Sequence, residues 1–73
     1  MSAFDKADRI VLEEAIRAGV LPEVLVYSDA KGWWAEQKQL GARVRFHSRD
    51  EAVAFARGWC RDNPPCVVRV AKA

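Results

Sequence analysis

The chain has 73 residues, which is the size of one small domain. Hydrophobic residues make up 51% of it and three residues are tryptophan, so the composition excludes a disordered chain and provides for a core. The net charge is only +2, which excludes a strongly basic or acidic protein and indicates no partner by itself.

The start of the chain is too acidic for a secretory signal, because its first twenty residues carry Asp5, Asp8, Glu13 and Glu14. The longest apolar run, residues 24–27, has about a fifth of the length that a helix needs to cross a bilayer. The sequence therefore predicts a cytoplasmic protein with no membrane partner.

Residues 3–18 are predicted to form an amphipathic helix, because apolar residues recur there at three- and four-residue spacing. Ser2 or Asp5 is suited to cap its start. Gly19 suits the left-handed position just past its end, and Pro22 prevents the helix from continuing. The expected apolar face consists of Phe4, Ala7, Val11, Leu12, Ala15, Ile16 and Ala18.

Three strands are predicted next, over residues 23–28, 33–39 and 42–47. The first turn ends at Gly32, which is free to take the positive φ that a bulged hairpin needs. A second turn falls at Gly41. Short turns of this kind join antiparallel neighbours, so the three strands are expected to form a meander.

The second predicted helix begins at a capping box, in which Ser48 and Glu51 satisfy each other's exposed backbone N–H groups. Apolar residues then repeat at i, i+3, i+4, i+7 and i+8 and form one continuous stripe. The two prolines after Asn63 end this helix, and residues 66–70 are predicted to form a last strand. The stripe consists of Ala52, Phe55, Ala56, Trp59 and Cys60.

The predicted fold is therefore α+β, with the element order α-β-β-β-α-β in a single domain over residues 1–73. The helix after the third strand returns the chain, so the fourth strand is expected to run parallel to the first. A right-handed crossover then places the fourth strand beside the first, in the spatial order 4-1-2-3.

The two faces of this sheet are expected to differ, because side chains alternate across a strand. The second helix is expected to cover the face that carries Val44 and Phe46, together with Trp33 and Ala35. The opposite face is expected to carry Trp34, Glu36, Lys38, Arg43, Arg45 and His47, with Arg69 nearby.

Strands one and four are apolar on both sides, which is typical of strands that are covered on both faces. Either the first helix or a second molecule is expected to provide the cover on the outer side. Alternatively, the first helix packs beside the second, against the small residues Ala54 and Gly58. The outer face is then open, and its apolar strip of Trp34 and Val67 needs a partner.

The two cysteines, Cys60 and Cys66, are interpreted as reduced thiols that fill core space in preference to a bridged pair, because two cysteines make no disulfide framework. Together with His47 they match no zinc spacing, so no metal is expected. A catalytic Cys–His pair needs a site that stabilises a thiolate, and neither cysteine is predicted to lie in one. The sequence also has no glycine-rich phosphate loop. We therefore expect no enzyme, no cofactor and no small-molecule substrate.

Aromatic and basic residues predicted to share the outer face form the candidate binding surface. An exposed aromatic side chain among arginines is suited to phosphate contact and base stacking, and the same residue types are enriched at protein interfaces. A third interpretation is a solvated face on which arginine stems cover Trp34. The candidate binding residues are Trp34, Arg43, Arg45, His47 and Arg69.

The valines that flank this surface favour a protein partner, because protein interfaces combine an aromatic and arginine centre with apolar surroundings. Nucleic-acid surfaces are in addition usually more strongly basic than this one. The sequence thus predicts a non-enzymatic interaction module that binds a protein partner or itself. Trp34 is the expected anchor and the arginines are the expected rim. Nucleic-acid binding through Arg43, Arg45 and Arg69 with Trp34 is the alternative.

Three short motifs resemble a bacterial family of short domains of unknown function. They are Lys31-Gly32-Trp33, Arg45-Phe46 and the segment from Ser48 to Ala56. Members of that family combine a strand that starts Gly-Trp, a basic strand that ends in Phe, and a helix that opens Ser/Thr-x-x-Glu-Ala. The resemblance covers residues 24–70 and implies a β-β-β-α-β fold, with no activity or cofactor attached.

The element order α-β-β-β-α also resembles the double-stranded-RNA-binding domain. That family places a lysine cluster at the start of its second helix to contact phosphates. The matching positions here are Arg49, Asp50 and Glu51, two of which are acidic. A fourth strand also follows, so both departures argue against this kind of RNA binding.

Overall fold

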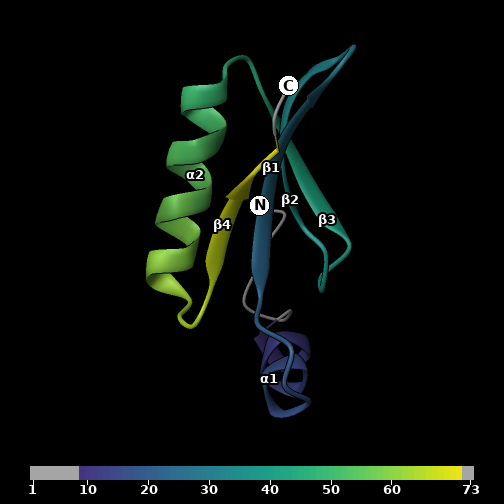
Figure 1. Cartoon of the computed structure of the whole chain (residues 1–73), viewed down its shortest axis with the longest axis vertical. Helices are drawn as coiled ribbons and strands as arrows, with labels where there is room; N and C mark the ends of the chain where they lie inside the picture. Colours follow the sequence, from purple (N-terminus) through teal and green to yellow (C-terminus); the bar gives the residue numbers. More distant parts are fainter. Residues whose placement is uncertain (1–8, 72–73) are drawn as a thin grey trace.

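The computed structural model describes residues 9–71, and the side chains of residues 12–71. This part of the chain contains two helices and four strands in the predicted order (Figure 1). The start of the predicted first helix, with Phe4 and Ala7, lies outside the described residues, as does the side chain of Val11. The elements are α1 (Arg9–Arg17), β1 (Glu23–Asp29), β2 (Gly32–Gln37), β3 (Ala42–Phe46), α2 (Arg49–Asp62) and β4 (Val67–Val70).

The four strands form one sheet in the order β3-β2-β1-β4. β2 is antiparallel to both β1 and β3, whereas β4 is parallel to β1. This order is the predicted 4-1-2-3 read from the opposite edge, so the α+β fold and the sheet order are confirmed. α2 connects β3 to β4, as a parallel strand needs a long crossover connection.

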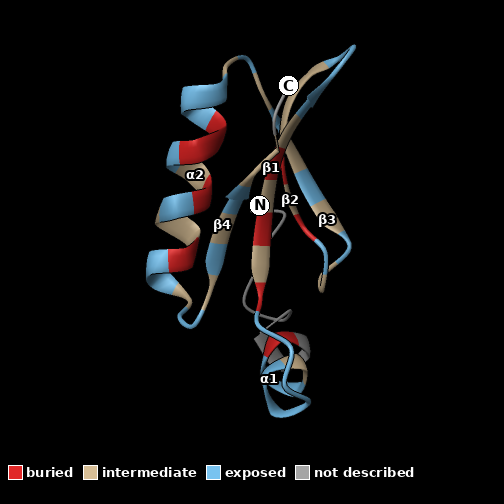
Figure 2. Ribbon diagram, in the orientation of Figure 1, coloured by how far each residue is buried: buried red, intermediate tan, exposed pale blue. Residues whose placement is uncertain are grey.

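Pairing between the strands decides which side chains face α2. Val26 pairs with Ala35 and Ala35 pairs with Val44, so these three residues form one row across the sheet. Val26 and Ala35 are completely buried, and the side of α2 turned toward them is buried as well (Figure 2). The predicted cover of this face by the second helix is therefore confirmed. The core consists of Val24, Val26, Ala35, Ala52, Val53, Ala56 and Cys60, with Trp33, Phe46, Phe55, Trp59, Cys66, Val68 and Val70 packed against it.

Contacts at both ends of α2 set its limits. The Ser48 hydroxyl oxygen accepts a hydrogen bond from the backbone N–H of Glu51 at 3.2 Å, as the capping box predicts. The Glu51 carboxylate accepts from the Ser48 hydroxyl at 3.2 Å and not from the Ser48 backbone N–H, so only one of the two predicted capping-box bonds is confirmed. At the other end, Asn63 donates its backbone N–H to the Cys60 carbonyl at 3.3 Å and its side-chain amide to the Trp59 carbonyl at 2.9 Å. Both termini of α2 are thus closed by local hydrogen bonds.

The end of α1 agrees with the prediction for Gly19, which has φ +86°. The Gly19 N–H donates to the Ile16 carbonyl at 3.0 Å, and the Val20 N–H donates to the Ala15 carbonyl at 2.9 Å. This pair of hydrogen bonds is a Schellman ending, which needs a residue in the left-handed conformation. The chain then turns toward β1.

The position of α1 differs from both predicted positions. α1 lies beyond the end of the sheet at which β1 begins, neither over the outer face nor beside α2 (Figure 1). Among its described side chains only Leu12 is buried, whereas Ile16 is 39% exposed. The apolar side chain of Ile16 is therefore not buried against either face of the sheet.

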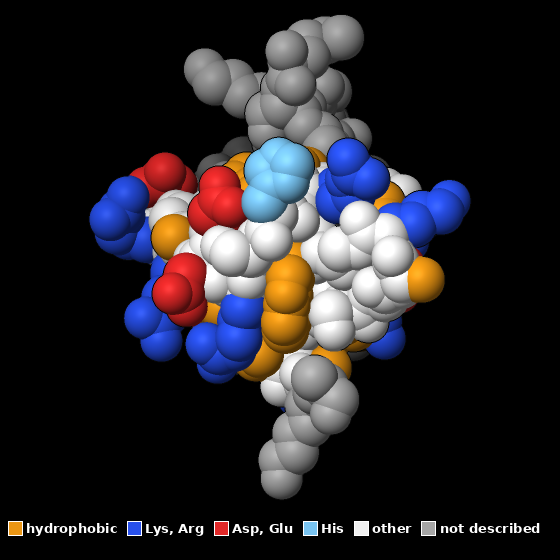
Figure 3. Space-filling model, turned by 90° about the horizontal axis from the view of Figure 1, so that it is seen from above, with side chains coloured by type: hydrophobic (Ala, Val, Ile, Leu, Met, Phe, Trp, Pro, Cys, Tyr) orange, Lys and Arg blue, Asp and Glu red, His pale blue; other side chains and the backbone are white. Residues whose placement is uncertain are grey.

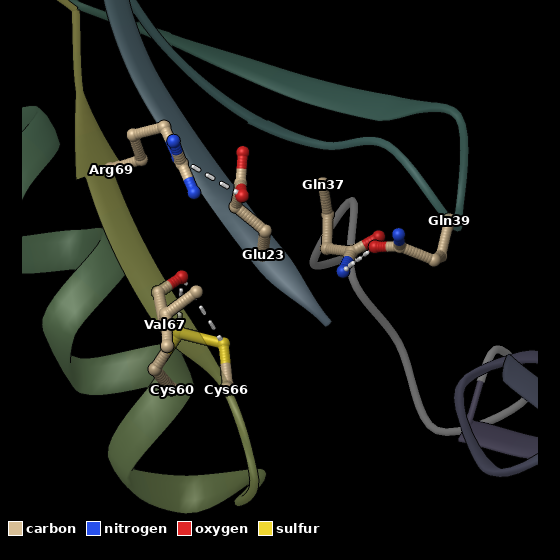
Figure 4. A network of polar contacts seen from close by, with 7 residues as sticks. All are labelled: Glu23, Gln37, Gln39, Cys60, Cys66, Val67 and Arg69. Carbon is tan, nitrogen blue, oxygen red and sulfur yellow. Dashed lines mark hydrogen bonds and ion pairs between the residues drawn. A yellow bond between two sulfur atoms is a disulfide. The ribbon is translucent and has the colours of Figure 1, made fainter. Parts of the chain in front are cut away.

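Gln37 ends β2 two residues before the predicted end. Its side chain is completely buried, and its amide oxygen accepts from the Leu40 backbone N–H at 3.0 Å. Its amide nitrogen donates to the Gln39 side-chain oxygen at 2.7 Å (Figure 4). A buried amide is stable only when its polar atoms have such partners. Gln37 thus fixes the turn between β2 and β3.

Cys60 and Cys66 form a disulfide, so the prediction of two reduced thiols is wrong. Cys60 lies in the last turns of α2 with its side chain in the core, and Cys66 lies just before β4 (Figure 4). Their Cα atoms are 5.0 Å apart, a distance that a disulfide can span. The spacing of the cysteines in the sequence does not reveal that they lie close together. Their distance depends on how residues 61–65 turn the chain back toward the helix.

Candidate interface on the outer sheet face

The outer face is the side of the sheet that points away from α2. Strand pairing places Tyr27 beside Trp34 and Trp34 beside Arg45, so these three side chains form one row across it. The neighbouring row begins at Arg69 on β4 and ends at Arg43 on β3. The outer face consists of Glu23, Leu25, Tyr27, Asp29, Trp34, Glu36, Arg43, Arg45, Val67 and Arg69.

Four of the five predicted binding residues lie together on this face, namely Trp34, Arg43, Arg45 and Arg69. The shared face of these four residues is therefore confirmed, while their role in binding stays a prediction. His47 follows the end of β3 and is exposed, so it lies outside the strand that was predicted to hold it.

The outer face is not covered by any described element. α2 packs on the opposite side, and α1 lies beyond the end of β1 (Figures 1 and 2). Leu25 and Trp34 are half-buried, and Val67 on the edge strand is 37% exposed. An aromatic and aliphatic strip therefore remains in contact with solvent in the described part of a single chain.

Trp34 lies at the centre of a chain of polar contacts. The guanidinium carbon of Arg43 is 3.9 Å from the centroid of the Trp34 ring, which is a cation–π stack. The indole N–H of Trp34 donates to the Asp29 carboxylate at 2.8 Å. Arg43 also donates to the Tyr27 hydroxyl at 3.2 Å, and this hydroxyl donates to the Glu36 carboxylate at 2.8 Å. These contacts hold Trp34 and Arg43 in one fixed orientation.

Acidic side chains accompany the arginines across the outer face. The Arg69 guanidinium donates to the Glu23 carboxylate at 3.1 Å on the β1–β4 side (Figure 4). Sequence reasoning missed Glu23 and Asp29 at this surface, although alternation along β1 places both on the side of Leu25. The three carboxylates are Glu23, Asp29 and Glu36, and the three guanidinium groups are Arg43, Arg45 and Arg69.

The contacts around Trp34 favour the charged forms of both neighbouring groups. The hydrogen bond from Trp34 holds the pKa of Asp29 below its ordinary value of 3.8, and the one from the Lys31 backbone N–H acts in the same direction. The hydrogen bond to Tyr27 raises the pKa of Arg43. The carboxylate and the guanidinium on either side of the indole thus both stay ionised at neutral pH.

The Asp29 contact predicts a pH dependence at Trp34. Because the pKa of Asp29 is lower in the fold than in the unfolded chain, its stabilising effect is present above pH 3.8 and is lost as the pH falls through the folded-state pKa. The proton resonance of the Trp34 indole N–H should therefore shift below about pH 4 in an NMR titration. The same resonance in Asp29→Asn should not titrate there, since the amide oxygen still accepts but carries no charge. An identical shift in the wild type and in Asp29→Asn would contradict the attribution of this pH dependence to the Asp29 carboxylate.

The distribution of charge over the molecule is mixed. In the view from the end at which β1 joins β2, basic side chains occur on both the left and the right, and most of the visible acidic side chains lie on the left (Figure 3). Within residues 9–71, no group of three or more His, Cys, Asp or Glu side chains is placed to hold a metal ion. No helix in the described range is long and apolar enough to cross a membrane, and the cytoplasmic location stays a prediction.

These features define the chain as a small α+β protein with one sheet face covered by a helix and one open face of aromatic and paired charged residues. Comparison with protein-family models, with curated proteins and with solved structures found no match. The resemblance to the bacterial family of short domains therefore stays a prediction, and the function is argued from the site alone.

Proposed function

We propose that the chain is a non-enzymatic interaction module whose outer sheet face binds the outer face of a second copy. The observation that carries this proposal is the open row of Tyr27, Trp34 and Arg45 on a face that no described element covers. Tyr, Trp and Arg are the residues most enriched at the centres of protein interfaces. The same strip that is half exposed in one chain loses its water contact when a second face closes on it.

The balance of charges favours a second copy over other partners. Three carboxylates and three guanidinium groups share the outer face, so two such faces meet without net repulsion. A two-fold axis brings one surface onto itself, and this arrangement requires that the surface be self-complementary. A face with equal numbers of acids and arginines supports such pairing, because each arginine has a carboxylate available to it on the second copy.

The Trp34–Arg43 stack is the proposed anchor of the interface. Its hydrogen bonds to Asp29 and Tyr27 already fix both side chains in the single chain. A side chain that is held before binding loses less conformational entropy when it is buried. Arg45 is exposed beside this stack and makes no ion pair with any residue that the structure describes, so it is free to pair across the interface.

The proposal is tested by sedimentation velocity at increasing protein concentration. The sedimentation coefficient of the wild-type chain should rise to that of a dimer at millimolar concentration. Arg45→Glu leaves the outer face with a net charge of about −2, so its dimer should weaken about tenfold or more. Arg61→Glu is the matched control, because Arg61 is an exposed arginine of α2 away from this face. A monomer at every concentration would contradict the proposal, and so would an equal loss in both variants.

Mixing two charge variants tests the face-to-face geometry. Glu36→Lys leaves the face with a net positive charge, so the dimer of this variant alone should weaken as well. An equimolar mixture of Arg45→Glu and Glu36→Lys should form a heterodimer, because their faces are now oppositely charged. Circular dichroism of each variant checks that the fold is retained. A mixture that stays monomeric while both variants are folded would oppose an outer-face contact.

Nucleic-acid binding is less well supported, because the carboxylates on this face repel phosphates and Arg69 is paired with Glu23. The alternative is checked by fluorescence anisotropy with labelled single- and double-stranded oligonucleotides at low salt. Binding that falls steeply with salt and disappears in Arg45→Glu would favour it over self-association. A catalytic thiol has no support, since both cysteines are joined in the disulfide.

A further inference from the structure

A second candidate surface lies on the other side of the sheet, where α2 and the edge strand β4 enclose a groove of about 370 Å³. Its apolar wall is made by Val53 and Ala54 of α2 and by Val68 and Val70 of β4. Arg49, Asp50 and Arg57 line the same groove from the helix, so two arginines and one carboxylate give its lining a net charge of +1. This groove shares no residue with the outer face, so it is independent of the proposed dimer.

The backbone of β4 offers hydrogen-bonding groups beside this groove. The N–H groups of Val67 and Ala71 donate to the carbonyls of Pro22 and Val26, on the side of β1. Backbone groups of successive residues in a strand point to opposite sides, so the N–H and C=O groups of Val68 and Val70 point to the free edge. Both residues therefore combine unpaired edge groups, within the described range, with side chains that line the groove.

The charge of the groove selects for an acidic occupant. Arg49, Val53 and Arg57 follow each other at four-residue spacing, so the two arginines lie on one face of α2 with an apolar residue between them. Asp50 approaches Arg49 at 3.9 Å, but its side chain is 96% exposed. Arg57 is exposed and has no ion pair among the described residues, which leaves it available to a carboxylate.

We propose that the groove binds an extended acidic peptide segment, which adds to the β4 edge as a fifth strand. The backbone of the peptide pairs with the edge groups of Val68 and Val70. Alternate apolar side chains enter the groove against Val53, and carboxylates of the peptide meet Arg49 and Arg57. Strand addition of this kind combines backbone hydrogen bonds for affinity with side-chain pockets for selectivity.

The probe for this proposal is a capped synthetic peptide of alternating valine and glutamate, titrated into the isotope-labelled chain and followed by NMR. Binding should slow hydrogen exchange at the Val68 and Val70 amides and shift their resonances, while the amide of Val67 is already bonded to the Pro22 carbonyl just before β1. The titration is made in Arg45→Glu as well as in the wild type. Peptide binding in the groove is thus tested separately from dimerisation through the outer face. Unchanged exchange at Val68 and Val70 under saturating peptide overturns the proposal.

Two variants test the charge and backbone contributions separately. Arg57→Glu should weaken peptide binding about tenfold, while Arg61→Glu should leave it unchanged because Arg61 does not line the groove. Val68→Pro removes an N–H that points to the free edge, where proline is tolerated, so binding should be lost while the sheet is kept. A matched peptide of alternating valine and lysine should not bind. Equal binding of both peptides, or equal effects of the two arginine variants, contradicts the assigned role of Arg57.

Discussion

Reduction of the Cys60–Cys66 disulfide should lower the free energy of unfolding by about 2 kcal/mol. The two cysteines are separated by 6 positions, so the cross-link closes a short loop and restricts the unfolded chain accordingly. For a domain of this size that loss is a large part of the total stability. The disulfide also ties the end of α2 to the start of β4, and these two elements form the walls of the groove.

The measurement is urea denaturation with and without a reducing agent. Cys66→Ala is the control, because its unfolding free energy should not respond to the reductant. Cys66 is half-buried and packs against the core, so its replacement lowers the stability by a fixed amount, and the comparison is of the response to the reductant alone. Equal unfolding midpoints for the oxidised and reduced wild type would contradict a stabilising disulfide.

Val26→Ala should destabilise the fold by about 2 kcal/mol, because it removes buried methyl groups and leaves a cavity at the centre of the sheet. Val26 is completely buried between its neighbours on β2 and β4, and it faces α2. Leu25→Ala is the matched substitution on the opposite face of the same strand. Leu25 is larger but only half-buried, so its truncation should cost about 1 kcal/mol or less in the monomer.

Both variants are compared by thermal and chemical unfolding in the Arg45→Glu background, in which the proposed dimer is weakened, and at a protein concentration low enough to keep the chain monomeric. The difference between the losses in unfolding free energy of the two variants measures how unequally the two sheet faces are covered in one chain. A larger cost for Leu25→Ala than for Val26→Ala would mean that the outer face is as closely packed as the inner one. Such a result is incompatible with an open outer face.

Local sequence patterns were sufficient to predict the element order, the sheet order and the two faces. Alternation in β3 separated Val44 from Arg43 and Arg45, and the strand pairing confirms that Trp34 shares the face of these arginines. The capping box at Ser48 located the start of α2. Each of these signals depends on residues a few positions apart, which the sequence displays directly.

The features that the sequence did not reveal depend on contacts between distant or irregular segments. The disulfide requires a particular path of residues 61–65, which the spacing of the cysteines does not specify. The position of α1 depends on the turn from Gly19 to Pro22, which directs the chain away from both sheet faces. The ion pair between Arg69 and Glu23 is also a contact between distant segments. Alternation along β1 already places Glu23 on the outer face, but its bond to Arg69 needs the neighbouring strand to be known.

The most direct test of an outer face that binds a second copy is an isotope-filtered NOE experiment on a mixture of labelled and unlabelled chains. The proposal predicts intermolecular NOEs that connect the ring protons of Trp34 and the methyl groups of Leu25 in one copy to outer-face residues of the other. Absence of any intermolecular NOE at millimolar concentration would contradict it. NOEs confined to α1, to the groove between α2 and β4, or to other residues away from the outer face would contradict it equally.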